Sequence, residues 1–251
     1  MSGHSKWASI KHKKAIVDSK RGKEFTKVAN MVTIAAKQGG KDPKMNFALR
    51  LAMDKARVVN MPAANIERAI KRGTGELGGA APVELLYEGY GPAGVAILVE
   101  AMTDNRNRTA SEVRSTFSKY GGSMAEAGAV SYIFQQKGLI NIVTANQHEK
   151  QEELELLIID SGAEDFEYID NELVVYTLKS DLQNVKEYLE TSGIKIENAE
   201  ITYIPNTETK INEANIASKV MKLIDVLEEN EDVTAVHANF DIPEEILEKM
   251  N

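Results

Sequence analysis

The 251-residue chain contains no cysteine, which excludes disulfide bonds, iron–sulfur clusters, thiolate zinc sites and a cysteine nucleophile. It also has no apolar run near the roughly 18 residues that a membrane-spanning helix needs. The basic N-terminus lacks the apolar segment and cleavage site of a signal peptide. These absences predict a soluble, cytoplasmic protein that does not bind a membrane.

The usual catalytic patterns are missing as well. Segment 89–94 matches the letters of a dinucleotide-binding loop, but it precedes a predicted strand instead of following one, so we reject that interpretation. His4 and His12 lie eight residues apart with no further ligand nearby, whereas a metal site needs three or four. We therefore predict a protein that is not an enzyme and that has no cofactor and no metal.

Charge is distributed very unevenly along the chain. Residues 1–75 hold 17 Lys and Arg against 5 Asp and Glu, a net charge of +12, while residues 76–251 carry −20. A cationic N-terminal region suits a polyanion, of which nucleic acid is the commonest. The acidic remainder would repel phosphate, so we expect binding to be directional, with the N-terminal region in front.

The N-terminal region is predicted to be a basic arm followed by three short helices. After residues 1–20, a helical period runs from Arg21 to a stop at Gly39-Gly40. The second helix is expected to begin at Asp42-Pro43 with an apolar stripe from Met45, and the third to run from Pro62 to Gly73. No short helix can bury such a stripe alone, so the three should pack as a bundle.

A glycine-rich hinge at 73–82 leads to a β-α-β segment. We expect strands at 95–102 and 130–134 and, between them, a helix at 109–120 that opens with a Thr109…Glu112 capping box. A helix from Ile216 and a strand at 233–240 are left without nearby partners and should complete this domain.

Residues 136–205 show the order β-α-β-β-α-β, which is typical of a ferredoxin-like unit, and carry −10. The predicted fold class is therefore α+β: a three-helix bundle with a basic arm, plus two ferredoxin-like domains, one inserted in the other. The predicted domains are 1–75, the discontinuous pair 76–135 and 206–251, and the inserted acidic domain 136–205, a possible surface for a protein partner.

The candidate site consists of cations that can neutralise phosphates and release their counterions. Trp7 could stack on a base or anchor the arm. The loop 103–109 could form a phosphate cradle at a helix N-terminus, or its arginines could pair with the acidic body. The predicted nucleic-acid-binding residues are Lys6, Trp7, Lys11, His12, Lys13, Lys14, Lys20, Arg21, Lys23, Lys27, Arg50, Arg57, Lys71, Arg72, Arg106 and Arg108.

Several motifs in a fixed order resemble the YebC/PmpR family, and the similarity covers essentially the whole chain. Two positions depart from the usual pattern: Ala93 stands where glycine is usual, and Ala129 where serine is usual. The matching segments are 3–7, 10–14, 20–27, 70–75, 87–92, 103–109, 121–122 and 128–130.

The resemblance implies a three-domain cytoplasmic protein with a helical N-terminal bundle and no catalytic activity. Most of the family is described as probable DNA-binding transcriptional regulators. Mitochondrial relatives act as translational activators, and bacterial members are linked to the ribosome and to stalling at proline-rich stretches. Two hypotheses therefore stay open: a DNA-binding transcriptional regulator, or a translation factor that binds the ribosome or its RNA.

Overall fold

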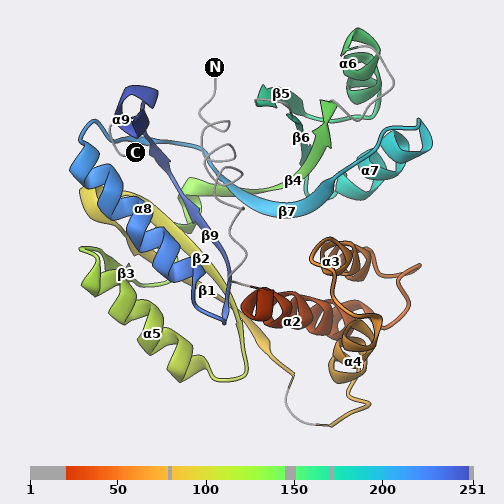
Figure 1. Cartoon of the computed structure of the whole chain (residues 1–251), viewed down its shortest axis with the longest axis horizontal. Helices are drawn as coiled ribbons and strands as arrows, with labels where there is room; N and C mark the ends of the chain where they lie inside the picture. The colour runs from red at the N-terminus through yellow and green to blue at the C-terminus, as the bar shows by residue number, and fades with distance from the viewer. Residues whose placement is uncertain (1–20, 79–80, 145–150, 170–171, 249–251) are drawn as a thin grey trace. The chain divides into compact units, whose positions relative to one another are not determined.

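The structure is a computed structural model that describes residues 21–78, 81–144, 151–169 and 172–248 (Figure 1). Within these residues the chain forms two compact units. The smaller comprises residues 135–204, and the larger comprises the described residues on either side of it. The finer division into three domains stays a prediction.

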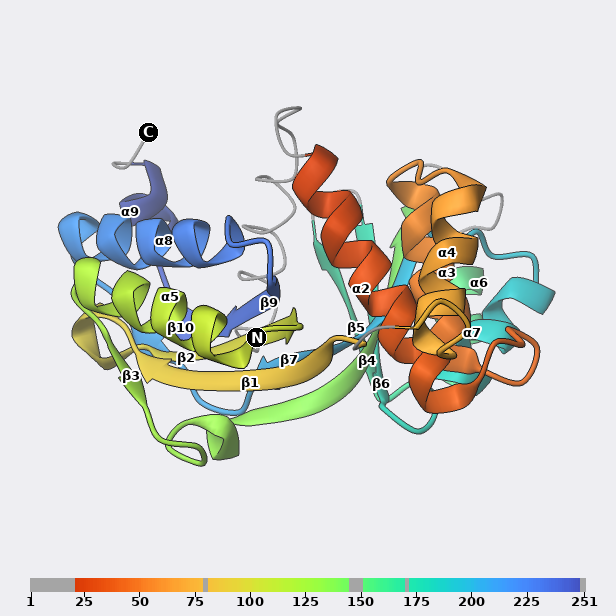
Figure 2. The same cartoon turned by 90° about the horizontal axis from the view of Figure 1, so that it is seen from below.

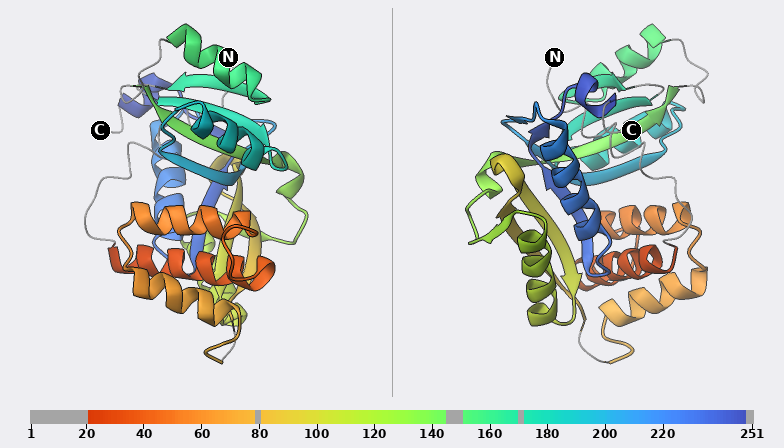
Figure 3. Two further views of the ribbon diagram at one scale, coloured as in Figure 1. Left: turned by 90° about the vertical axis from the view of Figure 1, so that its right-hand side faces the viewer. Right: turned by 60° about the vertical axis from the view of Figure 1, so that its left-hand side comes forward.

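Three helices near the N-terminal end of the larger unit form the predicted bundle. They are α2 (Arg21–Gly39), α3 (Phe47–Val58) and α4 (Ala63–Gly73). Helix α2 lies between the other two (Figure 3), and all three contribute buried apolar side chains to one core. That core is Val28, Val32, Ala35, Ala36, Leu49, Ala52, Ala56, Met61, Ile66 and Ala69.

The turn between α2 and α3 is organised by one buried amide, Asn46. Its side-chain oxygen accepts a hydrogen bond from the Leu49 amide at 3.0 Å, and its nitrogen donates to the carbonyl oxygens of Ala35 and Gly40, each at 2.8 Å. The predicted start at Asp42-Pro43 is therefore wrong, because Asn46 is the N-cap and α3 begins one turn later. Met45, placed in the apolar stripe by sequence, precedes α3 and is 84% exposed.

Helix α4 ends in close contact with α2. A Cβ atom added at Gly73 would lie only 2.2 Å from the carbonyl oxygen of Thr33, so glycine lets the two backbones approach.

A four-stranded antiparallel sheet forms the rest of the larger unit's framework, in the order β3-β1-β2-β9. Helices α5 and α8 lie on one of its faces (Figure 2). The bounds are β1 Val83–Tyr90, β2 Ala96–Thr103, α5 Arg106–Lys119, β3 Ser123–Ala125, α8 Ala214–Glu228 and β9 Val233–Ala238. This is the ferredoxin-like strand order, with β1 in the place that the third strand of an unbroken unit would take.

Shorter elements complete the larger unit. Strands β8 and β10 form a parallel two-stranded pair, and α9 follows near the C-terminal end. The bounds are η2 Pro92–Gly94, η3 Ser131–Ile133, β8 Thr209–Lys210, β10 Phe240–Asp241 and α9 Glu244–Glu248.

The smaller unit confirms the predicted ferredoxin-like order. Its sheet has the strand order β5-β6-β4-β7. The first and last strands of the segment, β4 and β7, are therefore neighbours in the sheet. Its elements are β4 Phe134–Val143, α6 Gln151–Asp160, β5 Asp165–Ile169, β6 Glu172–Leu178, α7 Leu182–Thr191 and β7 Asn198–Pro205. The fold class predicted from sequence is correct.

Two strand assignments near Glu88 required correction. Strand β1 was not predicted, and segment 130–134 was predicted as a strand but contains the 3-10 turn η3. The carboxylate of Glu88 accepts hydrogen bonds from the backbone amides of Gly128, Val130 and Ser131 at 2.7, 2.7 and 2.8 Å. Amide groups held in this way are not available to a sheet ladder, so the sheet edge is formed by β3 instead.

Glu88 is 5% exposed, so these bonds satisfy a carboxylate inside the protein. Burial alone raises the pKa of Glu88, but the three backbone N–H donors together outweigh burial and hold its pKa below the ordinary value. A lowered pKa in the folded state stabilises the fold above the pKa of the unfolded chain. That contribution is lost as the pH falls through the folded-state pKa.

We predict that Glu88→Gln lowers the free energy of unfolding at pH 7 by roughly 1–3 kcal/mol, because an amide offers one acceptor oxygen to three donors. Urea denaturation and amide hydrogen exchange at Gly128, Val130 and Ser131 measure the effect. The difference from the wild type should shrink as the pH falls from the unfolded-state pKa through the lower folded-state pKa and the wild-type carboxylate is protonated. A difference that stayed constant down to pH 2 would contradict this account.

The turn before β2 places an alanine in a left-handed conformation. Ala93 has φ +59° and Gly94 has φ +76°. Left-handed backbone costs a non-glycine residue about 1–2 kcal/mol, which explains why the resembling family usually has glycine at this position.

We predict that Ala93→Gly stabilises the larger unit by about 0.5–1 kcal/mol. The relieved strain of about 1–2 kcal/mol exceeds the roughly 0.5–1 kcal/mol of extra chain entropy that glycine loses on folding. Thermal unfolding of the two proteins checks the sign, and a lowered midpoint in the glycine variant would refute it. Ala125→Gly, in strand β3, is the control and should destabilise.

Candidate nucleic-acid interface

The predicted basic residues fall into two groups in the structure. Lys6, Trp7, Lys11, His12, Lys13, Lys14 and Lys20 lie outside the described residues, and so does the side chain of Arg21, the first residue of α2. The other predicted residues lie on described elements of the larger unit.

The two lysines in the first turns of α2 bind the end of another helix. The amine of Lys23 donates to the carbonyl oxygen of Glu229 at 3.2 Å, and that of Lys27 donates to the carbonyl oxygen of Glu228. These are among the last carbonyls of α8, where a cation is favourable because they have no partner within the helix and carry the negative end of its dipole. Lys23 and Lys27 thus hold α2 to α8.

Arg50 is held within its own turn. Its guanidinium donates to the carbonyl oxygens of Pro43 at 2.7 Å and Lys44 at 3.0 Å, and its central carbon lies 5.3 Å from the centre of the Phe47 ring. These contacts support the loop between α2 and α3 and leave Arg50 half-buried.

Arg57 and Lys71 form short pairs along their own helices. Arg57 lies 2.7 Å from the carboxylate of Asp54, and Lys71 lies 2.7 Å from that of Glu67. The hydrogen bond from Lys71 lowers the pKa of Glu67 and raises its own. Exposed pairs of this type contribute little to stability, so either cation can exchange its carboxylate for a phosphate at small cost.

Arg108 belongs to a polar cluster that joins α5 to the loop before β9. Its guanidinium donates to both carboxylate oxygens of Asp232, at 2.8 and 3.1 Å. The hydroxyls of Thr109 and Thr103 donate to the same carboxylate at 2.7 and 3.1 Å. Burial raises the pKa of Asp232, but these bonds, that of Arg108 foremost, outweigh it and lower the pKa.

This cluster also corrects the predicted start of α5. The N-cap is Asn105, whose side-chain oxygen accepts from the Arg108 amide at 3.2 Å, and the helix begins at Arg106. The predicted capping box at Thr109 is wrong because the Thr109 hydroxyl is buried against Asp232. The arginines of this loop were expected either to form a phosphate cradle or to pair with the acidic body. Arg108 does the second, because it pairs with Asp232.

In the bundle region and in α5, five cations make no side-chain hydrogen bond, ion pair or ring contact with another described residue. They are Lys37, Lys44, Arg68, Arg106 and Arg114. All five are exposed. Cations without carboxylate partners can bind phosphate without first breaking a pair, which makes these positions the accessible part of the basic surface.

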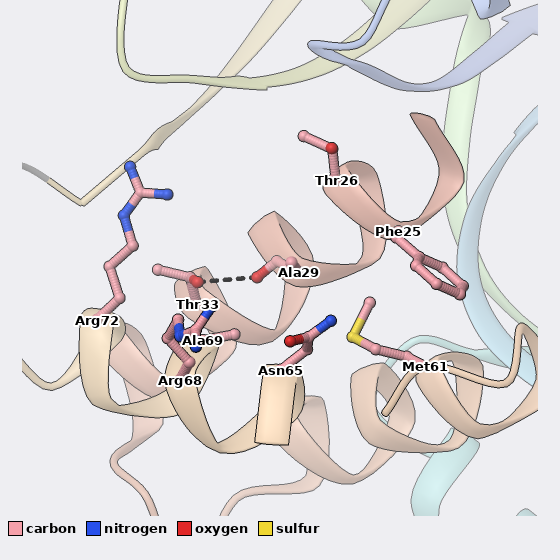
Figure 4. Close-up of a pocket in the computed structure, with 9 residues that line it drawn as sticks. All are labelled: Phe25, Thr26, Ala29, Thr33, Met61, Asn65, Arg68, Ala69 and Arg72. Carbon is pink, nitrogen blue, oxygen red and sulfur yellow. Dashed lines mark hydrogen bonds between the residues drawn. The ribbon is translucent and has the colours of Figure 1, made fainter. Parts of the chain in front are cut away.

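A groove of about 270 Å³ opens between α2 and α4 (Figure 4). Helix α2 contributes Phe25, Thr26, Ala29 and Thr33, α4 contributes Asn65, Arg68, Ala69 and Arg72, and Met61 comes from the loop just before α4. Of these residues, Arg72 belongs to the site predicted from the sequence, whereas Phe25, Asn65 and Arg68 do not. The spacing of 65, 68 and 72, which places three polar side chains on one helix face, was the available signal.

The described residues contain no group of three or more His, Asp or Glu side chains that could hold a metal ion. None of the described helices combines the length and the apolar character needed to cross a bilayer.

Comparisons with known proteins match both parts of the chain. Residues 5–76 match the TACO1/YebC protein N-terminal domain, and residues 82–240 match the TACO1/YebC second and third domain. The chain is 51% identical over 251 residues to a probable transcriptional regulatory protein of Halothermothrix orenii, covering 100% of this chain and 99% of that protein. It is 53% identical over 251 residues to one of Sulfurihydrogenibium sp., with the same coverage.

A solved structure agrees with the fold. The crystal structure of a conserved hypothetical protein from Aquifex aeolicus superimposes with a TM-score of 0.87 at 49% sequence identity, over 96% of this chain and 98% of that one.

We predict that Asp232→Ala lowers the free energy of unfolding by roughly 1–3 kcal/mol, because the buried hydroxyls of Thr103 and Thr109 lose their common acceptor. Asp104→Ala is the matched control, since Asp104 is exposed and lies 3.7 and 3.8 Å from Arg108 and Arg72. It should change stability by at most about 0.5 kcal/mol. Equal losses in the two variants, measured by urea denaturation, would contradict the assignment of Asp232 as the centre of the cluster.

Proposed function

The chain belongs to the TACO1/YebC family, and on this premise we propose that it is a non-enzymatic regulator of gene expression that binds nucleic acid through its basic N-terminal region. Relatives of this chain are named probable transcriptional regulatory proteins, which favours a regulatory role. We propose DNA as the first candidate target, bound in the cytoplasm without a cofactor.

One observation carries the proposal: the net charge of +12 over residues 1–75 against −20 over the remainder. Each cation that neutralises a phosphate releases a condensed counterion, and this gain does not depend on base sequence. The negative remainder opposes nonspecific coating of the nucleic acid and orients the approach. It also offers a surface to a protein partner.

The described cations support the same proposal. Lys37, Lys44 and Arg68 belong to the bundle region, and Arg106 and Arg114 to α5, and none of the five is paired to a carboxylate among the described residues. Lys71 and Arg57 add cations held only in exposed pairs. The bundle region and α5 thus present positive groups on their exposed surface.

Ribosomal RNA is the second candidate target. The observation that favours it is the groove between α2 and α4, because Asn65 and Arg68 line a hollow there. A helix that reads the DNA major groove presents such side chains on an outward ridge. Single-stranded loops in folded RNA offer unstacked bases that can enter hollows.

We predict that replacing Lys11, Lys13 and Lys14 together with Glu abolishes nucleic-acid binding and leaves the fold intact, because we place these residues in an arm outside any core. Co-sedimentation with ribosomes and mobility shift of promoter DNA, both at physiological salt, measure binding to the two candidate targets. If the variant loses binding in only one of the two assays, the nucleic acid used in that assay is the target bound through the arm.

The matched control replaces three lysines of the acidic segment 76–251 with Glu. They are Lys210, Lys219 and Lys222, and all three are exposed. It makes the same change in net charge and should weaken binding far less. Undiminished binding by the folded arm variant, or equal loss in both variants, would refute a dedicated role for the arm. Thermal unfolding followed by circular dichroism establishes that both variants are folded.

A further inference from the structure

We propose that the groove between α2 and α4 binds one unstacked nucleotide of a nucleic-acid strand. This inference rests on the proposed function and assigns a subsite to it. The base would lie against the apolar end of the groove, its edge would bond to Asn65, and its phosphate would bind Arg68 and Arg72. Figure 4 shows these side chains in that order along the groove, with Asn65 between the apolar and the cationic groups.

The apolar end consists of Phe25 and Met61. Phe25 packs partly buried against the bundle core, so its ring is held in place while part of it stays accessible. An aromatic ring provides a flat surface for a base, and such stacking tolerates any base. Met61 is 6% exposed and borders the groove from the bundle core, and its polarizable thioether suits contact with either a purine or a pyrimidine.

Asn65 supplies the polar group at the middle of the groove. Its side-chain amide carries both donors and an acceptor, and it makes no hydrogen bond to any described residue. The neighbouring hydroxyl of Thr33 is already committed, since it donates to the carbonyl oxygen of Ala29 at 2.8 Å. Asn65 is therefore the group that can recognise the edge of a base.

The cationic end consists of Arg68 and Arg72. Arg68 is exposed and has no ion pair among the described residues. Arg72 approaches the carboxylate of Asp104 only to 3.8 Å, which exceeds hydrogen-bonding distance. Both guanidinium groups can therefore make bidentate bonds to a phosphate. The two residues are four positions apart on α4, so their Cα atoms are separated by about 6 Å along the helix axis.

The size of the groove restricts the ligand to one nucleotide. Pockets for drug-sized ligands and cofactors span roughly 300–1,000 Å³, and this groove measures about 270 Å³. It is open on one side, so a nucleotide can enter while its strand continues outside. These features distinguish it from a site for a free dinucleotide cofactor.

The test uses the full chain and two oligonucleotides of ten nucleotides each, one of RNA and one of DNA. Each carries a single photoreactive 4-thiouracil or 4-thiothymine base, and fluorescence anisotropy measures its dissociation constant. The variants are Asn65→Leu, which fills the groove with an apolar side chain of high helix propensity, Arg68→Ala, and Phe25→Leu. Lys219→Ala is the control, an exposed cation removed from α8 of the same unit and not part of the proposed binding surface.

We expect the photoreactive base to crosslink to Phe25 or Met61. Asn65→Leu and Arg68→Ala should each raise the dissociation constant about 10-fold, and Phe25→Leu about 5-fold or more. Lys219→Ala should raise it less than about 3-fold. The oligonucleotide that shows this pattern identifies RNA or DNA as the source of the nucleotide.

Two other outcomes overturn the inference, and they separate it from the proposed function. If the wild type binds the oligonucleotides, ribosomes or DNA but the groove variants match Lys219→Ala and crosslinks map elsewhere, the groove assignment fails and the nucleic-acid function stands. If the folded wild type binds none of these, both fail. Circular dichroism of each variant excludes loss of fold as the cause of weak binding.

Discussion

Three short helices can bury their apolar faces only against one another, and this constraint determines where the cations of the bundle lie. Helix α2 shares its buried residues with α3 and α4, and the Gly73 contact draws the end of α4 onto the α2 backbone. Once these faces are used, charged side chains can lie only on the outer surface or along the seams between helices. The basic surface and the α2–α4 groove are thus both consequences of how one small core is filled.

Buried carboxylates organise the rest of the larger unit. Glu88 binds three backbone amides of one loop, and Asp232 binds two threonine hydroxyls and Arg108. Each has a pKa below its ordinary value because hydrogen bonds to the charged form outweigh burial. Many carboxylates of the acidic part solubilise the surface, but these two bind segments that are far apart in sequence. Because Arg108 is paired with Asp232, it is not one of the accessible cations.

Local periodicity sufficed to predict the bundle and the order of elements in residues 136–205, because each signal lies within one helix or strand. The errors occurred where a distant residue decides. Thr109 was predicted to cap helix α5, but its hydroxyl donates instead to Asp232, which is 123 positions away. Segment 130–134 is not a strand because its Val130 amide donates to Glu88 instead of to a neighbouring strand. Helix α3 begins later than predicted because the side chain of Asn46 donates to the carbonyl oxygen of Ala35. The groove was missed for the same reason: Phe25 and Asn65 come together only through packing.

Electrostatics and shape would act at different distances in the proposed binding. Charge of opposite sign at the two ends of the sequence acts over roughly the Debye length of 8–10 Å and orients an approaching polyanion, but it does not distinguish one strand from another. Selection requires contacts that form only at van der Waals distance, and the groove residues Phe25 and Asn65 are placed for those. Salt should therefore weaken the first step far more than the second. A groove variant would retain most of the salt dependence of binding while losing affinity, whereas loss of arm charges would reduce both.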